Sequence, residues 1–143
     1  GYMDALTQNG IPIDMDLIIP GNFTEEGGYS AMQRILPHAP DAVFVASDTM
    51  ALGALRAIQQ AGLRVPDDIA LTGFDDMPFA ARLNPPLTTV HQPVEETGMK
   101  AAETLFELLA DPESGPIHRL VTTEVVLRAS TGIVQADGLA NPP

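Results

Sequence analysis

The sequence has no cysteine and few basic residues. Without cysteine the chain cannot form a disulfide, bind a metal through thiolates or use a thiol nucleophile. Only 7 Lys and Arg stand against 19 Asp and Glu, which gives a formal net charge of −12. A chain this acidic is disfavoured on nucleic acid and on an anionic membrane surface. We therefore expect that residues 1–143 do not bind DNA by themselves, and from the absence of cysteine we expect a cytoplasmic protein.

Long hydrophobic runs are also absent. Runs such as Ala42–Ala46 are far shorter than the roughly 20 residues of a membrane-spanning helix. Yet 45% of the residues are hydrophobic, and 143 residues suffice for one domain with a core. Gly1–Leu6 reads as helix interior without a preceding cap or signal peptide, so we expect a piece of a longer protein.

Short apolar runs alternate with capped helices along the first half of the chain. Strands are predicted at 17–19, 42–46 and 69–72, and helices from Thr24 to about Pro37 and from Ser47 to Gly62, after a first helix that ends at Gly10. The strands are continuously apolar rather than alternating. This pattern predicts an α/β fold, a doubly wound parallel sheet with helices on both faces.

The pattern changes after the third strand. A strand at 88–91 follows Pro85 and Pro86, and the periodicity predicts a long helix, Val94–Ala110. We expect the apolar stripe of this helix to face inward: Met99, Ala102, Leu105, Phe106 and Leu109. A last strand is predicted from Leu120 to Leu127.

Ligands of parallel sheets bind outside the carboxyl ends of the strands. Three polar stretches occupy such positions: Gly21–Phe23, Ser47–Asp48 and Phe74–Asp76. The carboxylate of Asp75 can accept two hydrogen bonds from a diol or a ring N–H, but an ordinary acidic turn after Gly73 explains it equally well. We expect Asp76 to cap the turn that follows.

Three further positions have a binding role and a structural alternative. Ser47 and Asp48 begin a helix, where a side chain can cap the helix or contact a ligand. Phe23 could stack on a sugar or purine ring, or lie buried at a strand end. Gln92 could bind an effector or satisfy backbone groups of a hinge.

Other chemistries find little support. His38, His91 and His118 lack the spacing of metal ligands, so we expect no metal site and no cofactor. An α/β enzyme could use Asp75 or Asp48 as a base, but no matched nucleophile or second base accompanies them. We therefore expect no enzymatic activity.

An ordered set of motifs resembles the LacI/GalR family of bacterial transcription regulators. These motifs are DAVFVASDTMALG at 41–53, VPDDI at 65–69, TGFDD at 72–76, PLTTV at 86–90, QP at 92–93 and RAST at 128–131. Each motif alone is weak, but their order and spacing match the family from residue 1 to about Thr131. The alternative is a solute-binding protein of a sugar transporter, which would share the fold.

The resemblance implies part of an effector-binding region similar to a periplasmic sugar-binding protein, with two doubly wound subdomains. Residues 1–91 would form most of the second subdomain. Residues 92–119 would be a crossing and a helix of the first subdomain, 120–131 a returning strand, and 132–143 a flexible tail. The helix-turn-helix of the family would lie outside this chain, so operator DNA would be bound only through that missing domain.

The resemblance also implies site residues and partners. Asp75 and Phe23 would contact a small-molecule effector, a sugar or a nucleobase; Ser47 would be a contact, with Asp48 as cap or second contact. A homodimer would form through Tyr29, Leu52, Phe79, Ala80 and Leu83, unless loop 79–83 folds onto its own sheet. Because helix 94–110 would lack its home sheet, we expect dimer formation to bury it.

Overall fold

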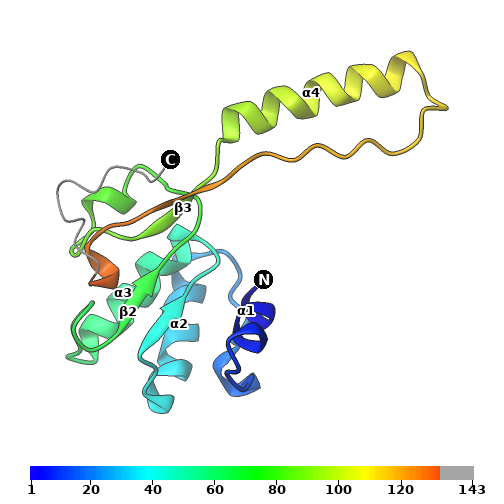
Figure 1. Cartoon of the computed structure of the whole chain (residues 1–143). Coiled ribbons are helices and arrows are strands. Elements are labelled where there is room, and N and C mark those ends of the chain that lie inside the picture. The colour runs from blue at the N-terminus through cyan, green and yellow to red at the C-terminus, as the bar shows by residue number, and fades with distance from the viewer. Residues whose placement is uncertain (133–143) are drawn as a thin grey trace, which may run out of the picture.

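The computed structural model describes residues 1–132 (Figure 1). Its helices are α1 (Tyr2–Gln8), α2 (Glu25–Ile35), α3 (Asp48–Gln60) and α4 (Val94–Ala110), and its strands are β1 (Ala42–Phe44), β2 (Ala70–Thr72), β3 (Thr89–His91) and β4 (Glu124–Val126). Short 3-10 turns lie at Met15–Leu17, Leu36–His38, Ala80–Arg82 and Ala129–Thr131. The predicted tail lies outside the described residues except for Gly132. Within 1–132 no helix is both long and apolar enough to cross a membrane.

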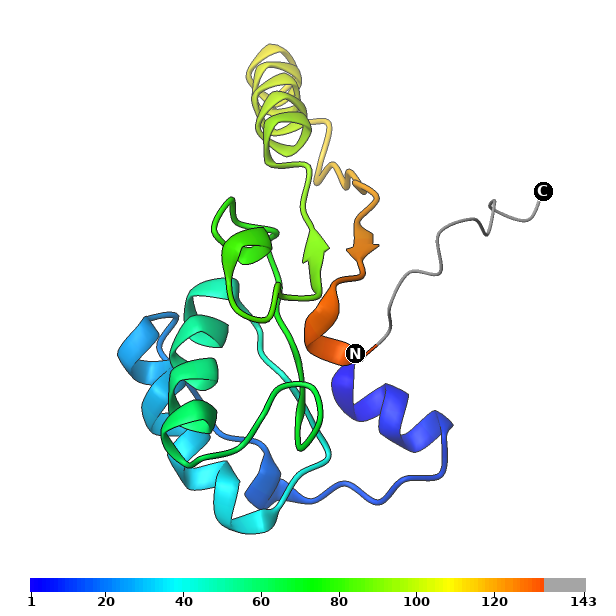
Figure 2. The same cartoon turned by 90° about the vertical axis from the view of Figure 1, so that its left-hand side faces the viewer.

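The body of the molecule is a parallel sheet between helices. β1 pairs with β2 in parallel, with Ala42 opposite Ala70. Parallel bridges join Thr72 to Thr88 and Asp75 to His91, and so extend the sheet towards β3. Helices α2 and α3 lie on one side of these strands and α1 on the other (Figure 2). The predicted α/β fold is confirmed.

Two glycines allow α2 and α3 to pack closely. A Cβ atom on Gly28 would overlap the Met50 carbonyl, and one on Gly53 would overlap the Glu25 carbonyl. Beneath this helix pair lies the core, in which Met32, Ile58 and Leu71 are at most 1% exposed. The closely packed helix pair therefore covers one face of the sheet.

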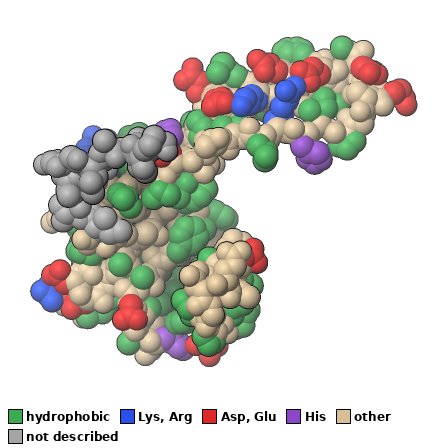
Figure 3. All heavy atoms as spheres, viewed as in Figure 1, with side chains coloured by type: hydrophobic (Ala, Val, Ile, Leu, Met, Phe, Trp, Pro, Cys, Tyr) green, Lys and Arg blue, Asp and Glu red, His purple; other side chains and the backbone are tan. Residues whose placement is uncertain are grey.

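An arm projects from this body. β3 and β4 form an antiparallel ribbon, with His91 opposite Glu124, and α4 continues from β3 away from the sheet (Figure 1). Residues 111–123 return alongside the helix, and Figure 3 shows the arm standing clear of the rest of the molecule. The ribbon is therefore the only link between body and arm within the described chain.

The strand predicted at Leu17–Ile19 is wrong. The Asp14 carboxylate accepts a hydrogen bond from the Asp16 N–H (2.9 Å), and the Ile18 N–H donates to the Met15 carbonyl (3.2 Å). These bonds close a 3-10 turn over Met15–Leu17. Ile18 is extended, but a strand also needs a ladder partner, and β1 pairs with β2 alone in the described sheet.

Of the strand predicted at 42–46 only Ala42–Phe44 forms, as β1, and the prediction that the segment is buried throughout is wrong. The Phe44 side chain is 52% exposed, and Ala42 and Ala46 are exposed as well. Val43 and Val45 pack against the core. The exposure alternates because the sheet is covered on the side of α2 and α3, while its other face and the free edge of β1 are partly open.

The inward stripe of α4 and the long last strand are also wrong. Helix α4 contains no buried residue, and Phe106 is 69% exposed. β4 spans only Glu124–Val126, and Leu120 is 94% exposed. The helix bounds follow from local periodicity, whereas burial needs a second surface, and none packs on this stripe within residues 1–132.

Candidate functional site

Polar side chains gather where β1, β2 and β3 end. The Asp48 N–H donates to the Phe74 carbonyl (2.7 Å), which ties the start of α3 to the loop after β2. The Asp75 N–H donates to the Val90 carbonyl (3.0 Å), which ties that loop to β3. The loops after three strands thus meet at one edge of the sheet, as expected for a parallel α/β fold.

Asp48 is fully buried and holds this edge together. Its carboxylate accepts the Thr89 hydroxyl (2.6 Å) and the Met77 N–H (2.7 Å). Burial raises the pKa of Asp48, while these two hydrogen bonds lower it in part. A Cβ atom on Gly73 would overlap Asp48, so glycine is required beside it. With both oxygens engaged inside the protein, Asp48 is suited to positioning the loops.

At this helix start the structure assigns the cap to Ser47 and not to Asp48. Ser47 is the N-cap of α3: its hydroxyl oxygen accepts the Met50 N–H (3.2 Å), and Asp48 is the first helical residue. The cap assigned to Asp48 is therefore wrong, because the carboxylate turns away from the helix towards Thr89. Ser47 is 5% exposed, so little of it faces solvent.

Asp75 offers a free acceptor at this edge. Its φ of +118° is unusual for a residue with a side chain. Gln92, at the base of the arm, donates to Asp75 Oδ1 through Nε2 (2.6 Å). Asp75 Oδ2 has no hydrogen-bond partner in the described chain, and the residue is half-buried. A ligand hydroxyl or N–H could therefore bind Oδ2 while Gln92 holds the other oxygen.

Asp76 does not cap a turn, so that prediction is wrong. Its two oxygens contact Arg128 Nη2 (2.6 Å) and His91 Nδ1 (3.1 Å). Burial alone would raise the pKa of Asp76, but the hydrogen bond and charge of Arg128, helped by His91, hold this pKa below its usual value. Arg128 also donates to the Leu87 carbonyl (2.8 Å). Asp76 therefore fixes the base of the arm through Arg128 and His91.

Sequence reasoning missed Thr89, His91 and Arg128 as members of this cluster. Arg128 lies 52 residues from Asp76, and Thr89 lies 41 residues from Asp48. One signal was available: Arg128 is one of only 7 basic residues and ends an apolar run. When such a run becomes a strand of a sheet, a cationic side chain at its end is partly buried and needs an acidic or hydrogen-bonding partner.

Phe23 is exposed, so the alternative of a buried strand-end Phe is wrong. It is 69% exposed, and its φ of +58° is costly for a bulky residue. Thr24, the N-cap of α2, follows it and accepts the Gly27 N–H (3.0 Å). Phe23 lies at an apolar groove that neither Asp75 nor Gln92 lines. The structure thus groups Asp75 and Gln92 with Ser47 and Asp48, and places Phe23 on a neighbouring surface.

The residues predicted for a dimer interface differ in exposure. Tyr29 and Leu52 are partly exposed on α2 and α3, and the Arg56 guanidinium lies 4.5 Å from the Tyr29 ring centroid. Phe79 is half-buried, Leu83 packs against the core, and Ala80 is fully buried. Loop 79–83 is therefore partly folded onto its own sheet, and Ala80 supports this surface from beneath.

No metal centre is formed within residues 1–132: nowhere there do three His, Asp or Glu side chains gather closely enough to hold an ion. His91 faces Asp76, and it contributes to the electrostatics of the arm. The described acidic residues are thus engaged in hydrogen bonds and ion pairs or exposed to solvent.

The chain matches the family model described as periplasmic binding protein-like domain over residues 1–131. It is 43% identical over 132 residues to a probable HTH-type transcriptional repressor, ExuR, of Bacillus subtilis, covering 91% of this chain and 40% of that protein. It is 42% identical over 133 residues to the HTH-type transcriptional repressor CytR of Escherichia coli, covering 92% and 39%. The chain thus spans about two fifths of the length of these relatives.

Solved structures of transcriptional regulators are also similar to the chain. A transcriptional regulator CelR–cellobiose complex is similar with a TM-score of 0.85 and 37% identity, covering 90% of this chain and 40% of that one. A LacI family regulator from Enterococcus faecium with bound ribose is similar with a TM-score of 0.80 and 30% identity, covering 91% and 48%. Both similarities extend over almost the whole described chain.

Proposed function

The chain belongs to the periplasmic-binding-protein-like domains of LacI/GalR transcription regulators, and we propose that it senses a small-molecule effector and contributes to dimer formation in such a regulator. The observation that carries this proposal is the free Asp75 Oδ2 beside Gln92, at the carboxyl ends of the strands. A regulator needs an acceptor of this kind at a position from which effector binding can change the orientation of another part of the protein.

The proposed effector is a sugar, with a nucleobase as the second candidate. Asp75 would accept a hydroxyl group, and Gln92 would orient the carboxylate or bind the same ligand. Ser47 would complete the polar wall, Asp48 would keep the loops in place, and Phe23 would supply an aromatic face from the neighbouring surface. The bound cellobiose and ribose of two similar regulators support testing sugars first.

The position of Gln92 suggests how binding would be transmitted. Gln92 and His91 lie where the body passes into the arm, and both contact acids of the loop after β2. An effector that binds Asp75 would favour one orientation of this crossing over the others. A ligand shifts such an equilibrium only by its difference in affinity between the two states.

The domain assignment remains a proposal. Residues 1–91 would be most of one subdomain, 92–119 a crossing and a helix of the other, and 120–131 the returning strand. A part of the protein outside residues 1–143 would bind operator DNA. Consistent with this division, the net charge of this chain is −12.

Dimer formation is proposed through the surface of Tyr29, Leu52, Phe79 and Leu83. We also infer a non-enzymatic, cytoplasmic protein, because the relatives named above are transcriptional repressors and a regulator works where the DNA is. A solute-binding protein of a sugar transporter is the disfavoured alternative, since those relatives carry transcriptional names.

The proposal is tested by thermal-shift screening of the full-length protein against sugars, sugar phosphates and purines. A ligand at 100 times its dissociation constant adds about 2.7 kcal/mol of stability. We expect a hit that Asp75→Asn weakens by at least about 10-fold, because the amide replaces one acceptor oxygen by a donor.

Asp16→Asn is the matched control, an exposed aspartate in the turn before Ile18, and it should leave the hit unchanged. A hit that survives Asp75→Asn at full strength would place the effector elsewhere. The absence of any sugar or purine hit would refute the proposed effector classes.

A further inference from the structure

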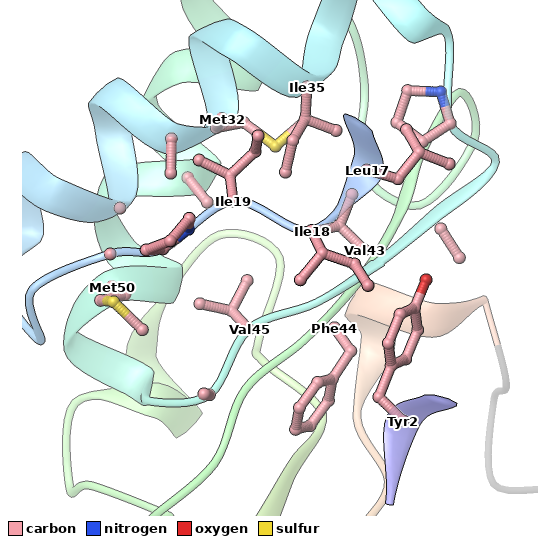
Figure 4. A pocket seen from close by; sticks show the side chains of 18 of the residues that line it. Tyr2, Leu17, Ile18, Ile19, Met32, Ile35, Val43, Phe44, Val45 and Met50 are labelled. Atoms are coloured by element: carbon pink, nitrogen blue, oxygen red, sulfur yellow. The ribbon is translucent and has the colours of Figure 1, made fainter. Parts of the chain in front are cut away.

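Three side chains of this chain belong to the type whose ordinary charge change falls between about pH 5 and pH 8: His38, His91 and His118. Within residues 1–132 only His91 of the three lies within ion-pair distance of a carboxylate. The apolar groove shown in Figure 4 is lined by no His, Asp, Glu, Lys or Arg side chain. A response of the described chain to mild acid is therefore expected at His91, where the body passes into the arm, and not at the groove.

One carboxylate of the body holds both strands of the ribbon that carries the arm. His91, the last residue of β3, lies with its Nδ1 atom 3.1 Å from Asp76 Oδ2. Arg128, which follows β4, lies with its Nη2 atom 2.6 Å from Asp76 Oδ1. The Asp76 side chain is only 18% exposed, whereas the His91 side chain is 49% exposed and open to proton exchange with solvent. The outgoing and the returning strand therefore share Asp76 as their common partner.

Acidic side chains outnumber basic ones around His91. Asp75 and Asp76 lie in the loop after β2, and a parallel bridge joins Asp75 to His91. Glu124 of β4 stands opposite His91 in the antiparallel ladder, where the Cβ atoms of paired residues are about 4.5–5.5 Å apart. The cation of this cluster, Arg128, is engaged by Asp76. The flanking elements add further acids, namely Asp48 at the start of α3 and Glu95 and Glu96 in the first turn of α4. A proton on His91 thus places a positive charge among carboxylates.

We propose that His91 is a proton-dependent lock of the arm: protonation of its ring in mild acid strengthens the contact with Asp76 and holds the arm in the orientation that Figure 1 shows. The neutral ring donates from Nδ1 in one tautomer only, whereas the protonated ring donates from both nitrogens and forms a charge-assisted bond. Loss of the proton weakens this bond and leaves the Arg128 contact in place. The arm then stays attached to the body but adopts a wider range of orientations.

The direction of the pH effect follows from proton linkage. An orientation in which His91 contacts Asp76 binds the proton more tightly than one in which the two residues have separated. Lower pH therefore increases the population of the locked orientation. Gln92 follows His91 directly and donates to Asp75 Oδ1 (2.6 Å), so the lock acts on the same crossing that the proposed effector would bias. The lock itself requires no effector, and it can be tested without one.

The absence of cysteine allows a direct measurement of the arm orientation in the 143-residue chain. Ser30→Cys on α2 and Ser114→Cys after α4 replace exposed residues and introduce the only two thiols. Spin labels on these thiols report the distance between body and arm by double electron–electron resonance. The labelled chain also carries Phe106→Ser and Leu109→Ser, so that association through the exposed stripe of α4 does not restrain the arm.

We expect the distance distribution to be about 2-fold narrower at about pH 5.5 than at about pH 8, because an imidazole passes from mostly neutral to mostly charged over this range. His91→Gln keeps a hydrogen-bond donor without the charge and should give the wide distribution at both pH values. His38→Gln and His118→Gln are the matched controls, since neither histidine contacts a carboxylate within residues 1–132, and both variants should keep the narrowing. Asp76→Asn, which removes the charge that the lock needs, should abolish it.

Two results would overturn the proposal. Equal widths at both pH values in the chain that retains His91 would show that its protonation does not restrain the arm. A narrowing that persists in His91→Gln would assign the pH response to another group. Because neither readout involves effector binding, failure here leaves the proposed function untouched, and failure of the effector screen leaves the lock untouched.

Discussion

The Gln92 Nε2 atom lies 2.6 Å from Asp75 Oδ1, and this contact joins the base of the arm to the loop after β2. The two residues are 17 positions apart, and both are half-buried. A charge-assisted hydrogen bond at such a junction links Asp75, the proposed ligand acceptor, to the segment whose orientation the proposed effector would change.

The energetic link between Asp75 and Gln92 can be measured by a double-mutant cycle. We expect Asp75→Asn and Gln92→Leu to be non-additive by about 1 kcal/mol in unfolding free energy, because each removes the same hydrogen bond. The control pair is Asp75→Asn with Gln59→Leu, whose amide donates to the Asn84 carbonyl. That pair should be additive within about 0.5 kcal/mol. Additivity of the first pair would mean that the contact contributes nothing.

Removal of the buried Asp48 carboxylate should destabilise the body strongly. Asp48→Ala leaves the Thr89 hydroxyl and the Met77 N–H without their acceptor. We expect a loss of about 3 kcal/mol in urea unfolding, the usual range for an unpaired buried group. Asp16→Ala, at an exposed aspartate, should change stability by no more than about 0.5 kcal/mol. A loss for Asp48→Ala no larger than that of the control would contradict the view that Asp48 holds these loops together.

Acid should weaken the contacts that Asp76 makes at the base of the arm. The pKa of Asp76 lies below its ordinary 3.8, so its contribution is present above that value and is lost as the pH falls through the lower folded pKa. The raised pKa of Asp48 acts in the opposite direction, since stability from its proton uptake grows as the pH falls. We expect Asp76→Asn to be less stable than the unmodified chain at pH 7, and the difference to narrow below about pH 4.

Denaturant titrations between pH 7 and pH 2 measure this difference. The comparison is with Asp16→Asn, which should follow the unmodified chain over the whole range. A gap between Asp76→Asn and the unmodified chain that stays constant with pH would show that the Arg128 contact does not depend on Asp76 ionisation.

Gly28 of α2 and Gly53 of α3, which lie at the contact between the two helices, should tolerate no side chain. Gly53→Ala places a methyl group against the Glu25 carbonyl, and we expect a loss of about 2 kcal/mol or more from this overpacking. Gly98→Ala on α4 is the matched control, because a Cβ atom on Gly98 would meet nothing within 4 Å. Alanine there should promote helix formation by up to about 1 kcal/mol. Thermal unfolding of the body and helix content by circular dichroism distinguish the two.

The exposed stripe of α4 should cause the isolated chain to associate. Phe106 and Leu109 are 69% and 67% exposed, and such a patch favours self-association. We expect light scattering at micromolar concentration to give a dimer mass, and Phe106→Ser with Leu109→Ser to give a monomer. Ile13→Ser, at a site 40% exposed between α1 and the turn Met15–Leu17, should leave the mass unchanged. A monomer mass for the unmodified chain in light scattering would contradict this hypothesis.

Local patterns predicted the elements well where neighbouring residues decide the outcome. The bounds of α4 match the prediction, and α3 and α2 begin where Ser47 and Thr24 supply caps. The pairs that build the site could not be predicted in the same way. Thr89 with Asp48 and Arg128 with Asp76 lie 41 and 52 residues apart, and no periodicity relates such positions.

The sequence by itself determined the α/β order of elements, the acidic surface, the absence of thiol chemistry and the placement of Asp75 after a strand. These depend on composition, short-range periodicity and the chain order of polar loops. Tertiary structure alone decided that Asp48 turns inward, that Asp76 pairs with Arg128, and that Ile18 has no ladder partner and Phe106 no cover in residues 1–132. Burial and pairing depend on the second surface that meets a residue, and a pattern along one chain does not contain that surface.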